Sequence, residues 1–258
     1  MKNKWIHFDI DKENIFGMIC GLIMVLLSIA MTLLNSEIGN IILRDILMIL
    51  FLGYFTPVYY ISIIKKKNLS VLGLHKNKLI VSLAINAITG ISLLAMFITQ
   101  NTKDIVLNLN LFYATTYILV AGIFEMVFIY GFLRYEFERA FGILPAVLLT
   151  VIFYSLHHAG FQPEFTKLFF VGLMYVTVFY FTQNIFSIFP FFWGVGAIWD
   201  VLVKSEAGSQ LKNKTSFIIA ILMFIAMTGV SIFIHSMNKK MNNKMTMDRI
   251  KTYKDNNG

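Results

Sequence analysis

Long apolar runs without charges are the feature that most limits what this chain can fold into. The stretches Asn14–Leu34 and Ser216–His235 each hold about 20 mostly apolar residues, enough to cross a hydrocarbon core of roughly 30 Å as a helix. The alternating segments of about ten residues that mark a membrane β-barrel do not occur in the sequence. Only 14% of the 258 residues are charged, whereas soluble domains carry roughly a quarter. The sequence therefore predicts an integral membrane protein.

Hydropathy along the chain predicts an all-α fold, a polytopic membrane helical bundle with about eight transmembrane helices. The second helix is the least uniform, because Arg44 and Asp45 lie near its start and Pro57 interrupts its second half. No internal repeat is present, so residues 1–236 are expected to form one domain. The helices are predicted at residues 14–35, 39–64, 78–99, 108–134, 142–160, 165–183, 185–203 and 215–236.

Basic residues cluster beside the apolar segments and account for the net charge of +8 without a nucleic-acid motif. The loop 65–78 and the tail 237–258 are rich in lysine, as is typical of cytoplasmic segments that contact anionic lipid. Both termini are therefore predicted to be cytoplasmic, in a plasma membrane of bacterial type. The loop 204–214 argues against this topology, because its three lysines would lie outside. The tail is expected to be disordered or to lie on the lipid surface.

Four ionisable residues interrupt the apolar background of the second half: Glu125, His157, His158 and Asp200. Such groups are costly within a membrane and mark functional sites by default. If residues 139–142 form a tight turn between antiparallel helices, Glu125 and His157 each lie 16 residues from its centre, about 24 Å of helix rise. They should therefore lie at one level. Asp200 lies 15 residues beyond the next turn, near residue 185, and can share that level.

A neutral imidazole and a carboxylate at one depth suit either a zinc ion with a bound water or general-base catalysis. We therefore predict Glu125 and His157 as a catalytic pair that could hold zinc or another divalent metal. On a helix His158 is about 100° from His157, so both rings are not expected to point straight at one ion. Simpler interpretations remain open, namely an interhelical hydrogen bond for Glu125 and for His157 and an interfacial position for Asp200.

These residues lie in three short motifs. Phe153–His157 (FYSLH) matches F-x-x-x-H, Glu125–Gly131 has the spacing of E-E-x-x-x-R-G, and Gly196–Asp200 has that of H-x-x-x-N/D. In this order on an eight-helix membrane protein, they resemble the CPBP intramembrane metalloproteases, also called the Abi family. That family includes type II CAAX-prenyl endopeptidases and bacteriocin-processing or immunity proteins. The resemblance covers about residues 112–203, and the first three predicted helices carry none of it.

The resemblance implies an endopeptidase that uses zinc or another divalent metal and acts on a peptide or a membrane-associated protein. It also implies roles for the motif residues. Glu125 and His157 would activate the attacking water, and Asp200 would support the site that binds the oxyanion. Beyond the substrate, the expected partner is the lipid bilayer, and no nucleic acid is expected.

The chain departs from the family motifs in three places, because Met126 stands at the second Glu, Tyr130 at the Arg and Gly196 at the His. His158 is a candidate replacement for the missing imidazole, whereas Glu164 is expected to lie about a turn and a half too shallow. These departures leave a second function open, that of a catalytically inactive membrane scaffold or bacteriocin-immunity-like protein with the same fold. The lack of an inverted repeat disfavours a proton-coupled transporter.

Overall fold

The computed structural model describes residues 3–34, 36–100, 108–160, 164–204 and 210–256. Within this part the secondary structure is helical, with no strand, and six helices are long and apolar enough to cross a membrane. The predicted all-α, polytopic helical bundle is confirmed. The six helices are Lys12–Leu33 (α1), Glu37–Ile64 (α2 to η2), Leu79–Gln100 (α4), Leu109–Phe141 (α5 to α6), Phe165–Thr182 (α8) and Lys214–Lys239 (part of α10).

The other two predicted helices are shorter than a full crossing. The segment predicted at 142–160 forms α7 (Ile143–Leu156), which stops before the histidines. The segment predicted at 185–203 is divided into a 3₁₀ turn, η5 (Ile185–Ser187), and α9 (Phe191–Trp199), which continues into η6 (Asp200–Lys204). Proline lacks a backbone N–H, and Pro190 stands at the N-cap of α9, where the helix starts anew. A hydropathy profile alone does not detect such breaks in a helix.

The second predicted helix is a continuous rod that alternates between α and π geometry. Its Arg44 and Asp45 form an ion pair inside the bundle, and Asp45 also accepts a hydrogen bond from the Tyr117 hydroxyl. The short 3₁₀ helix η3 (Leu69–Leu72) follows in the next loop. The rod consists of α2 (Glu37–Asn40), η1 (Ile41–Phe55), α3 (Thr56–Tyr59) and η2 (Tyr60–Ile64).

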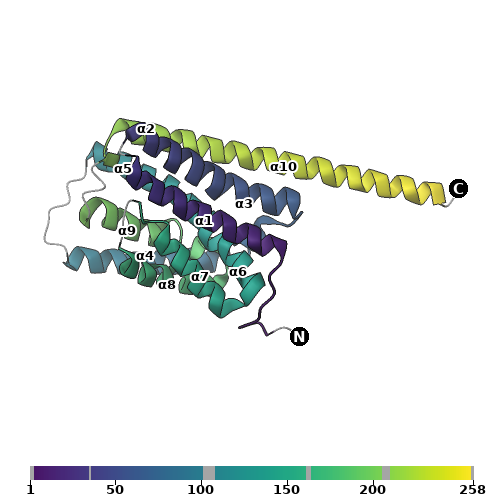
Figure 1. The fold of residues 1–258 in the computed structure, drawn as a ribbon, viewed down its shortest axis with the longest axis horizontal. Coiled ribbons are helices and arrows are strands. Elements are labelled where there is room, and N and C mark those ends of the chain that lie inside the picture. Colours follow the sequence, from purple (N-terminus) through teal and green to yellow (C-terminus); the bar gives the residue numbers. More distant parts are fainter. Residues whose placement is uncertain (1–2, 35, 101–107, 161–163, 205–209, 257–258) are drawn as a thin grey trace.

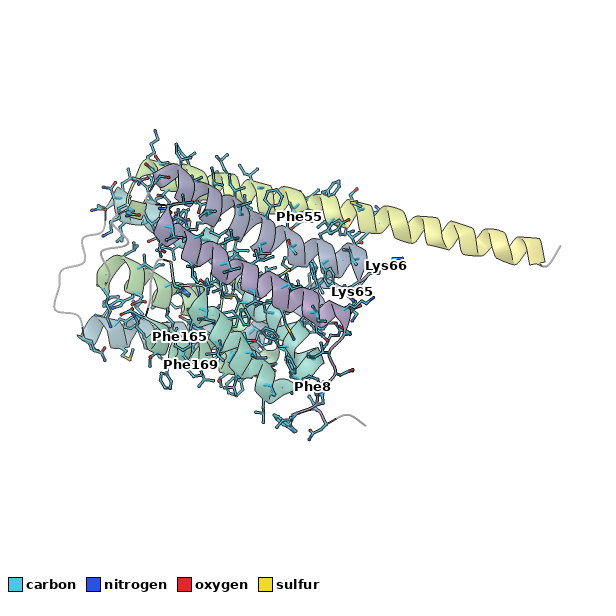
Figure 2. All side chains as sticks on the ribbon, viewed as in Figure 1. Phe8, Phe55, Lys65, Lys66, Phe165 and Phe169 are labelled. Carbon is cyan, nitrogen blue, oxygen red and sulfur yellow. The ribbon has the colours of Figure 1, made fainter. Side chains whose placement is uncertain are left out.

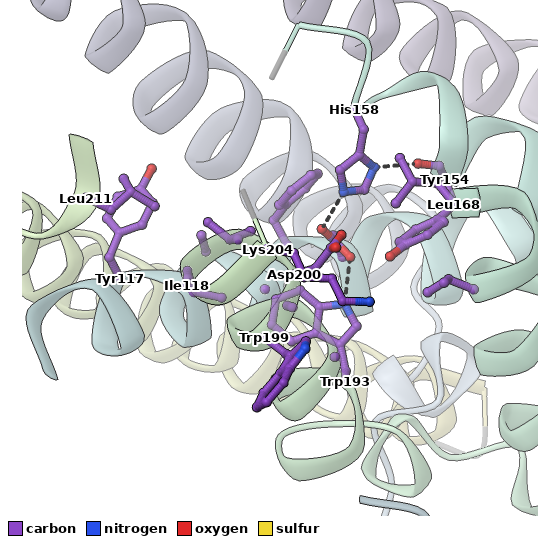
Figure 3. A pocket seen from close by; sticks show the side chains of 18 of the residues that line it. Tyr117, Ile118, Tyr154, His158, Leu168, Trp193, Trp199, Asp200, Lys204 and Leu211 are labelled. Carbon is purple, nitrogen blue, oxygen red and sulfur yellow. Dashed lines mark hydrogen bonds and ion pairs between the residues drawn. The ribbon is translucent and has the colours of Figure 1, made fainter. Parts of the chain in front are cut away.

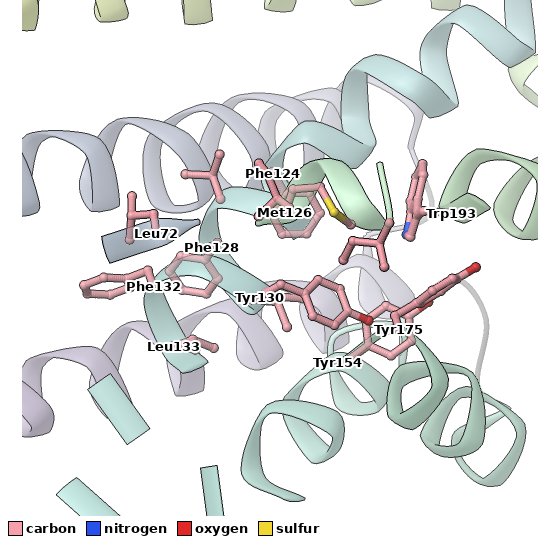
Figure 4. Close-up of a cluster of buried hydrophobic side chains, with 14 of the residues drawn as sticks. Leu72, Phe124, Met126, Phe128, Tyr130, Phe132, Leu133, Tyr154, Tyr175 and Trp193 are labelled. Carbon is pink, nitrogen blue, oxygen red and sulfur yellow. The ribbon is translucent and has the colours of Figure 1, made fainter. Parts of the chain in front are cut away.

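The core of the bundle forms around the helix Leu109–Phe141. In its apolar window 72% of the residues are buried, against 17–44% in the other five candidate spans. A helix that is apolar on all sides belongs at the centre of a bundle, and Phe128, Phe132 and Leu133 lie there in one buried cluster (Figure 4). The helix consists of α5 (Leu109–Phe124), the π-helix η4 (Glu125–Leu133) and α6 (Arg134–Phe141).

The N-terminus, the basic loop after η2 and the C-terminal extension lie at one end of the bundle. Figure 1 shows α10 (Lys214–Asn256) projecting past this end, and Figure 2 places Lys65 and Lys66 there. The tail predicted to be disordered or lipid-bound is thus helical as far as Asn256, and it contains no Gly or Pro up to that residue that would end a helix. Which side of the membrane this end faces stays a prediction, and residues 205–209 and 257–258 lie outside the described part.

Candidate active site

Glu125 lies at the middle of the central helix. It is 16 residues from Leu109 at one end and 16 from Phe141 at the other, and it begins the π-helical segment η4. Such π-helical turns are rare and occur frequently at functional sites. The residue is only 6% exposed, so its carboxylate must find its partners within the protein.

His157 and His158 follow α7 directly and do not lie within a helix as predicted. His157 is the C-cap of α7, with φ −68° and ψ −14°, and His158 follows in a turn. His157 keeps αR dihedrals and the chain turns at His158, and the two rings nevertheless lie together, with their centroids 3.8 Å apart. The Nδ1 atoms of His157 and His158 lie 2.6 Å and 2.8 Å from the carbonyl oxygen of Tyr154. That oxygen only accepts hydrogen bonds and has two lone pairs, so both Nδ1 atoms donate to it.

The second ring nitrogen of each histidine faces Glu125. Nε2 of His157 lies 3.4 Å from Oε1 of Glu125, and Nε2 of His158 lies 3.8 Å from the same oxygen. A neutral imidazole that carries its proton on Nδ1 presents a lone pair at Nε2. Three acceptor atoms therefore converge on one buried space. Their mutual repulsion must be offset by a proton, a cation or the hydrogens of a water molecule.

The three residues fit a divalent metal ion. One ligand atom from each of Glu125, His157 and His158 lies within 4.8 Å of the other two. One carboxylate and two neutral imidazoles form the donor set of a class of catalytic zinc sites that leave a position for water. Tetrahedral bonds of about 2.0 Å separate neighbouring ligand atoms by roughly 3.3 Å, close to the 3.4 Å and 3.8 Å found here. The bonds from Nδ1 to Tyr154 are of the kind that orient metal-ligating histidines.

Trp193 on α9 holds the other oxygen of Glu125. Its indole N–H donates a hydrogen bond to Oε2 at 2.8 Å, while Oε1 faces the two imidazoles. The two carboxylate oxygens thus have different partners. The sequence prediction did not include Trp193. The available signal was its position on one helix face with Gly196 and Asp200, at spacings of three and four residues.

Asp200 lies outside the group formed by Glu125 and the two histidines. It starts η6 and pairs with Lys167 of α8, which also bonds Glu164 at 2.6 Å. Glu164, predicted to be too shallow, is likewise outside the group that could hold a metal. The sequence prediction missed Lys167, because a single lysine near a helix start carries no motif.

The buried group borders a cavity of about 650 Å³. Glu125, His158, Trp193 and Asp200 all line it, and Figure 3 shows His158 and Trp193 pointing into one space beside Asp200. The volume falls in the range of ligand pockets, roughly 300–1,000 Å³. A short peptide segment can therefore reach the carboxylate and one of the imidazoles.

Apolar packing surrounds two of the three positions that depart from the family motifs, Met126 and Tyr130, and the third, Gly196, borders the cavity. Met126 is buried in the core. The Tyr130 ring packs against Tyr154 and Tyr175, with centroids 5.7 Å and 6.3 Å away (Figure 4), and its hydroxyl has no hydrogen-bond partner among the described residues. A Cβ atom at Gly196 would overlap the Tyr175 hydroxyl. A histidine at position 196 therefore has no room while Tyr175 keeps its place.

The turn that carries the histidines is held against α1. The Gly160 N–H donates to Oγ of Ser28 at 2.9 Å, and a Cβ atom at Gly160 would overlap the backbone carbonyl of Ser28. Only glycine permits such a close approach. The first helix carries none of the motifs, yet it positions His157 and His158.

Residues 106–198 match a family model described as type II CAAX prenyl endopeptidase Rce1-like. The matched segment contains Glu125, both histidines and Trp193, and it ends two residues before Asp200. No curated protein and no solved structure matches the chain.

Proposed function

The chain belongs to the CAAX protease (CPBP) family of membrane endopeptidases, and on this premise we propose that Glu125 and His157 activate water to hydrolyse a peptide bond within the membrane. The substrate is a peptide or a membrane-associated protein. One observation carries the proposal. A carboxylate and two imidazole nitrogens converge on one buried space beside a cavity large enough for a peptide.

Glu125 acts as the general base in this proposal. Oε1 accepts a proton from water while the water oxygen bonds to the scissile carbonyl carbon, and the proton passes to the amide nitrogen as the C–N bond breaks. Trp193 holds Oε2, so the free lone pairs of Oε1 point at the reacting water. Nε2 of His157, 3.4 Å from Oε1, orients the same water, and the Tyr154 carbonyl fixes the ring that carries it.

Glu125 and His157 are also the residues we propose as ligands of zinc or another divalent metal, with His158 as the third ligand. A bound metal would supply a Lewis acid that polarises the substrate carbonyl and activates water. Asp200 lines the same cavity and, with Lys167, would present a charged pair to the substrate. Its proposed role is to support the binding of the substrate next to the reacting bond.

The proposal is tested by removing the base and its partner separately. Glu125→Gln and His157→Ala are each expected to abolish proteolysis while the protein still accumulates in membranes. Mass spectrometry of protein termini, in membranes of cells producing the wild type or either variant, identifies the new termini that depend on this site. Immunoblotting of the same membranes controls for protein amount. Cleavage that persists in both variants would refute the proposal.

A second function, that of a catalytically inactive scaffold or immunity-like protein, is favoured by two observations. Tyr130 stands at the position of the motif Arg, and its hydroxyl has no hydrogen-bond partner in the described part of the chain. Gly196 stands at the position of the motif His. This alternative predicts that wild-type membranes contain no new termini relative to Glu125→Gln membranes. It also predicts less than one bound metal per purified chain. Cleavage that depends on Glu125 excludes it.

A further inference from the structure

One face of α9 borders the cavity. Trp193, Gly196 and Asp200 all line the cavity, and their spacings of three and four residues place them on this one face. The first bonds the Glu125 carboxylate and the last pairs with Lys167. Gly196 lies between them and contributes no side chain. The groups that act on a substrate beside α9 must therefore come from another element at this point.

Tyr175 of α8 occupies the space that Gly196 leaves open. Its hydroxyl lies where a Cβ atom of residue 196 would stand, and the residue is only 1% exposed. Edge-on contacts hold the ring, against Phe192 at 5.1 Å and Tyr154 at 6.3 Å between centroids. Figure 4 shows Tyr175 beside Tyr154. The position of the hydroxyl is thus fixed by packing on both sides of the ring.

The hydrogen of the Tyr175 hydroxyl is available to a ligand. Among the described residues no hydrogen bond engages this hydroxyl, which belongs to a cavity-lining side chain. The neighbouring donors are engaged, because the Trp193 N–H bonds Glu125 and the Lys167 ammonium bonds Asp200. A carbonyl group beside this face of α9 would find its donor in Tyr175.

We propose that the Tyr175 hydroxyl donates a hydrogen bond to the oxygen of the scissile carbonyl as negative charge develops on it. This inference rests on the proposed endopeptidase function and adds a catalytic residue to it. Tyr175 keeps its proton, since the proton released by water travels through Glu125 to the leaving amine. A donor fixed in a site shielded from water stabilises such an oxyanion far better than a mobile one. Gly196 is the residue that makes room for it.

The activity test compares two tyrosines of the same cluster. Purified protein in lipid nanodiscs is assayed with a synthetic peptide that spans a cleavage site identified in wild-type membranes. Tyr175→Phe is expected to lower kcat by about 100-fold and to change KM by less than about two-fold. Tyr130→Phe is the matched control, because it removes a buried hydroxyl that does not line the cavity, and it should leave both constants unchanged. Equal kcat values for the two variants would overturn the inference.

A second measurement tests the geometry without activity. Gly196→Ala is expected to lower the thermal unfolding midpoint when Tyr175 is present, because the new Cβ overlaps the hydroxyl. In the Tyr175→Phe background the same change should be tolerated, because the ring carbon Cζ lies at an ordinary 3.6 Å from that Cβ. Equal destabilisation in both backgrounds would mean that the hydroxyl does not occupy this space.

The proposed endopeptidase function and the proposed role of Tyr175 can be refuted separately. If Glu125→Gln abolishes cleavage and Tyr175→Phe does not, the proposed function stands and only the role of Tyr175 is wrong. If cleavage survives in Glu125→Gln, or the wild type cleaves nothing, the proposed function is refuted and the catalytic role of Tyr175 falls with it. The unfolding measurement still decides whether the hydroxyl fills the space at Gly196.

Discussion

Glu125 and Glu136 lie on one continuous helix, 11 residues apart, and both are buried. Their surroundings differ. Oε2 of Glu136 accepts hydrogen bonds from the Asn14 side chain at 3.0 Å and from the Arg139 guanidinium at 2.8 Å. Glu125 has the Trp193 indole N–H on one oxygen and the imidazole nitrogens on the other. Glu136 has a permanent cation beside it, and among the described residues no lysine or arginine pairs with Glu125.

We take this difference to distinguish a structural carboxylate, Glu136, from the carboxylate that we propose to act in catalysis, Glu125. The charge of Glu136 is compensated within the protein, and Arg139 extends the network to Asp11 and Glu13 at 2.7 Å and 2.9 Å. That arrangement ties the N-terminal segment to the central helix. The charge of Glu125 is left for a proton or a cation to compensate, and a group in this condition can exchange protons with a substrate or bind a metal.

The largest difference in kcat is expected between two single variants, Glu125→Gln and Glu136→Gln. Glu125→Gln removes the proposed base and should lower kcat by about 1,000-fold, with little loss of stability because the amide oxygen can still accept the hydrogen bond from Trp193. Glu136→Gln should leave kcat within about two-fold and destabilise the protein by about 1–3 kcal/mol, because a hydrogen bond to a charged group is weakened. Peptide cleavage and SDS-titrated unfolding in mixed micelles check both. Similar changes in kcat and in stability for the two variants would show that the two carboxylates do not differ in role.

The next effect concerns the cation that only Glu136 has. Arg139→Gln leaves Glu136 buried without its guanidinium and should destabilise the protein by about 3 kcal/mol. Adding Glu136→Gln should recover part of this loss, because the uncompensated charge disappears. Unfolding of the two single variants and the double variant gives the coupling energy. Strictly additive losses would show that the pair is not coupled.

Counting from the turn was sufficient to place Glu125 and His157 at one level, because α6 and α7 do pack as an antiparallel pair about Gly142. The 3.4 Å contact between the two side chains agrees with that count. The class of fold also followed from apolar runs, since the length of a helix needed to cross a bilayer is set by the bilayer.

Other features required the three-dimensional structure. Whether His158 points at the same space as His157 depends on where α7 ends, and backbone dihedrals at a C-cap are not encoded in hydropathy. Trp193 and Tyr175 are two of many aromatic residues in a chain with 15% aromatic content, so residue type alone does not single them out. The Ser28 contact joins residues 132 positions apart. Only packing reveals such partners.

The third effect concerns metal binding, which we propose for the site of Glu125 and not for Glu136. His158→Ala removes one of the three proposed ligands and should weaken zinc binding by about 100-fold, the upper range for loss of even an outer-shell partner. Glu136→Gln should leave the affinity unchanged, because Glu136 is not in the group of described residues that could hold a metal. Competition with a chromophoric chelator, together with elemental analysis of the purified protein, measures both. Unchanged zinc binding in His158→Ala would remove His158 from the site.

A smaller effect is expected from Trp193→Phe. The substitution removes the N–H on Oε2 of Glu125 and frees the carboxylate to rotate, so kcat should fall by about 10-fold, the cost of roughly one hydrogen bond to a charged group. Trp199→Phe is the matched control, because Trp199 lines the same cavity and stacks on Phe97 with centroids 4.9 Å apart. Equal losses would indicate that cavity shape, and not the indole N–H, sets the rate.

The smallest effect lies at the solvent end of the Glu136 network. Burial opposes ionisation of Asp11, but the hydrogen bond from the Asn14 backbone and the Arg139 charge outweigh it, so the pKa of Asp11 lies below its ordinary value. The ionised Asp11 therefore stabilises the folded state fully above its unfolded-state pKa, near pH 4. This stabilisation is lost as pH falls through the folded-state pKa.

Asp11→Asn keeps a good helix cap and removes only the charge. Because the Asp11 side chain is 44% exposed, the variant should be less stable at pH 7 by under about 1 kcal/mol. The difference in thermal unfolding midpoint between wild type and variant should shrink to zero between pH 4 and the folded-state pKa, since a protonated Asp11 has no charge to lose. A difference that stays the same from pH 7 to below the folded-state pKa would mean that the charge of Asp11 contributes nothing to stability.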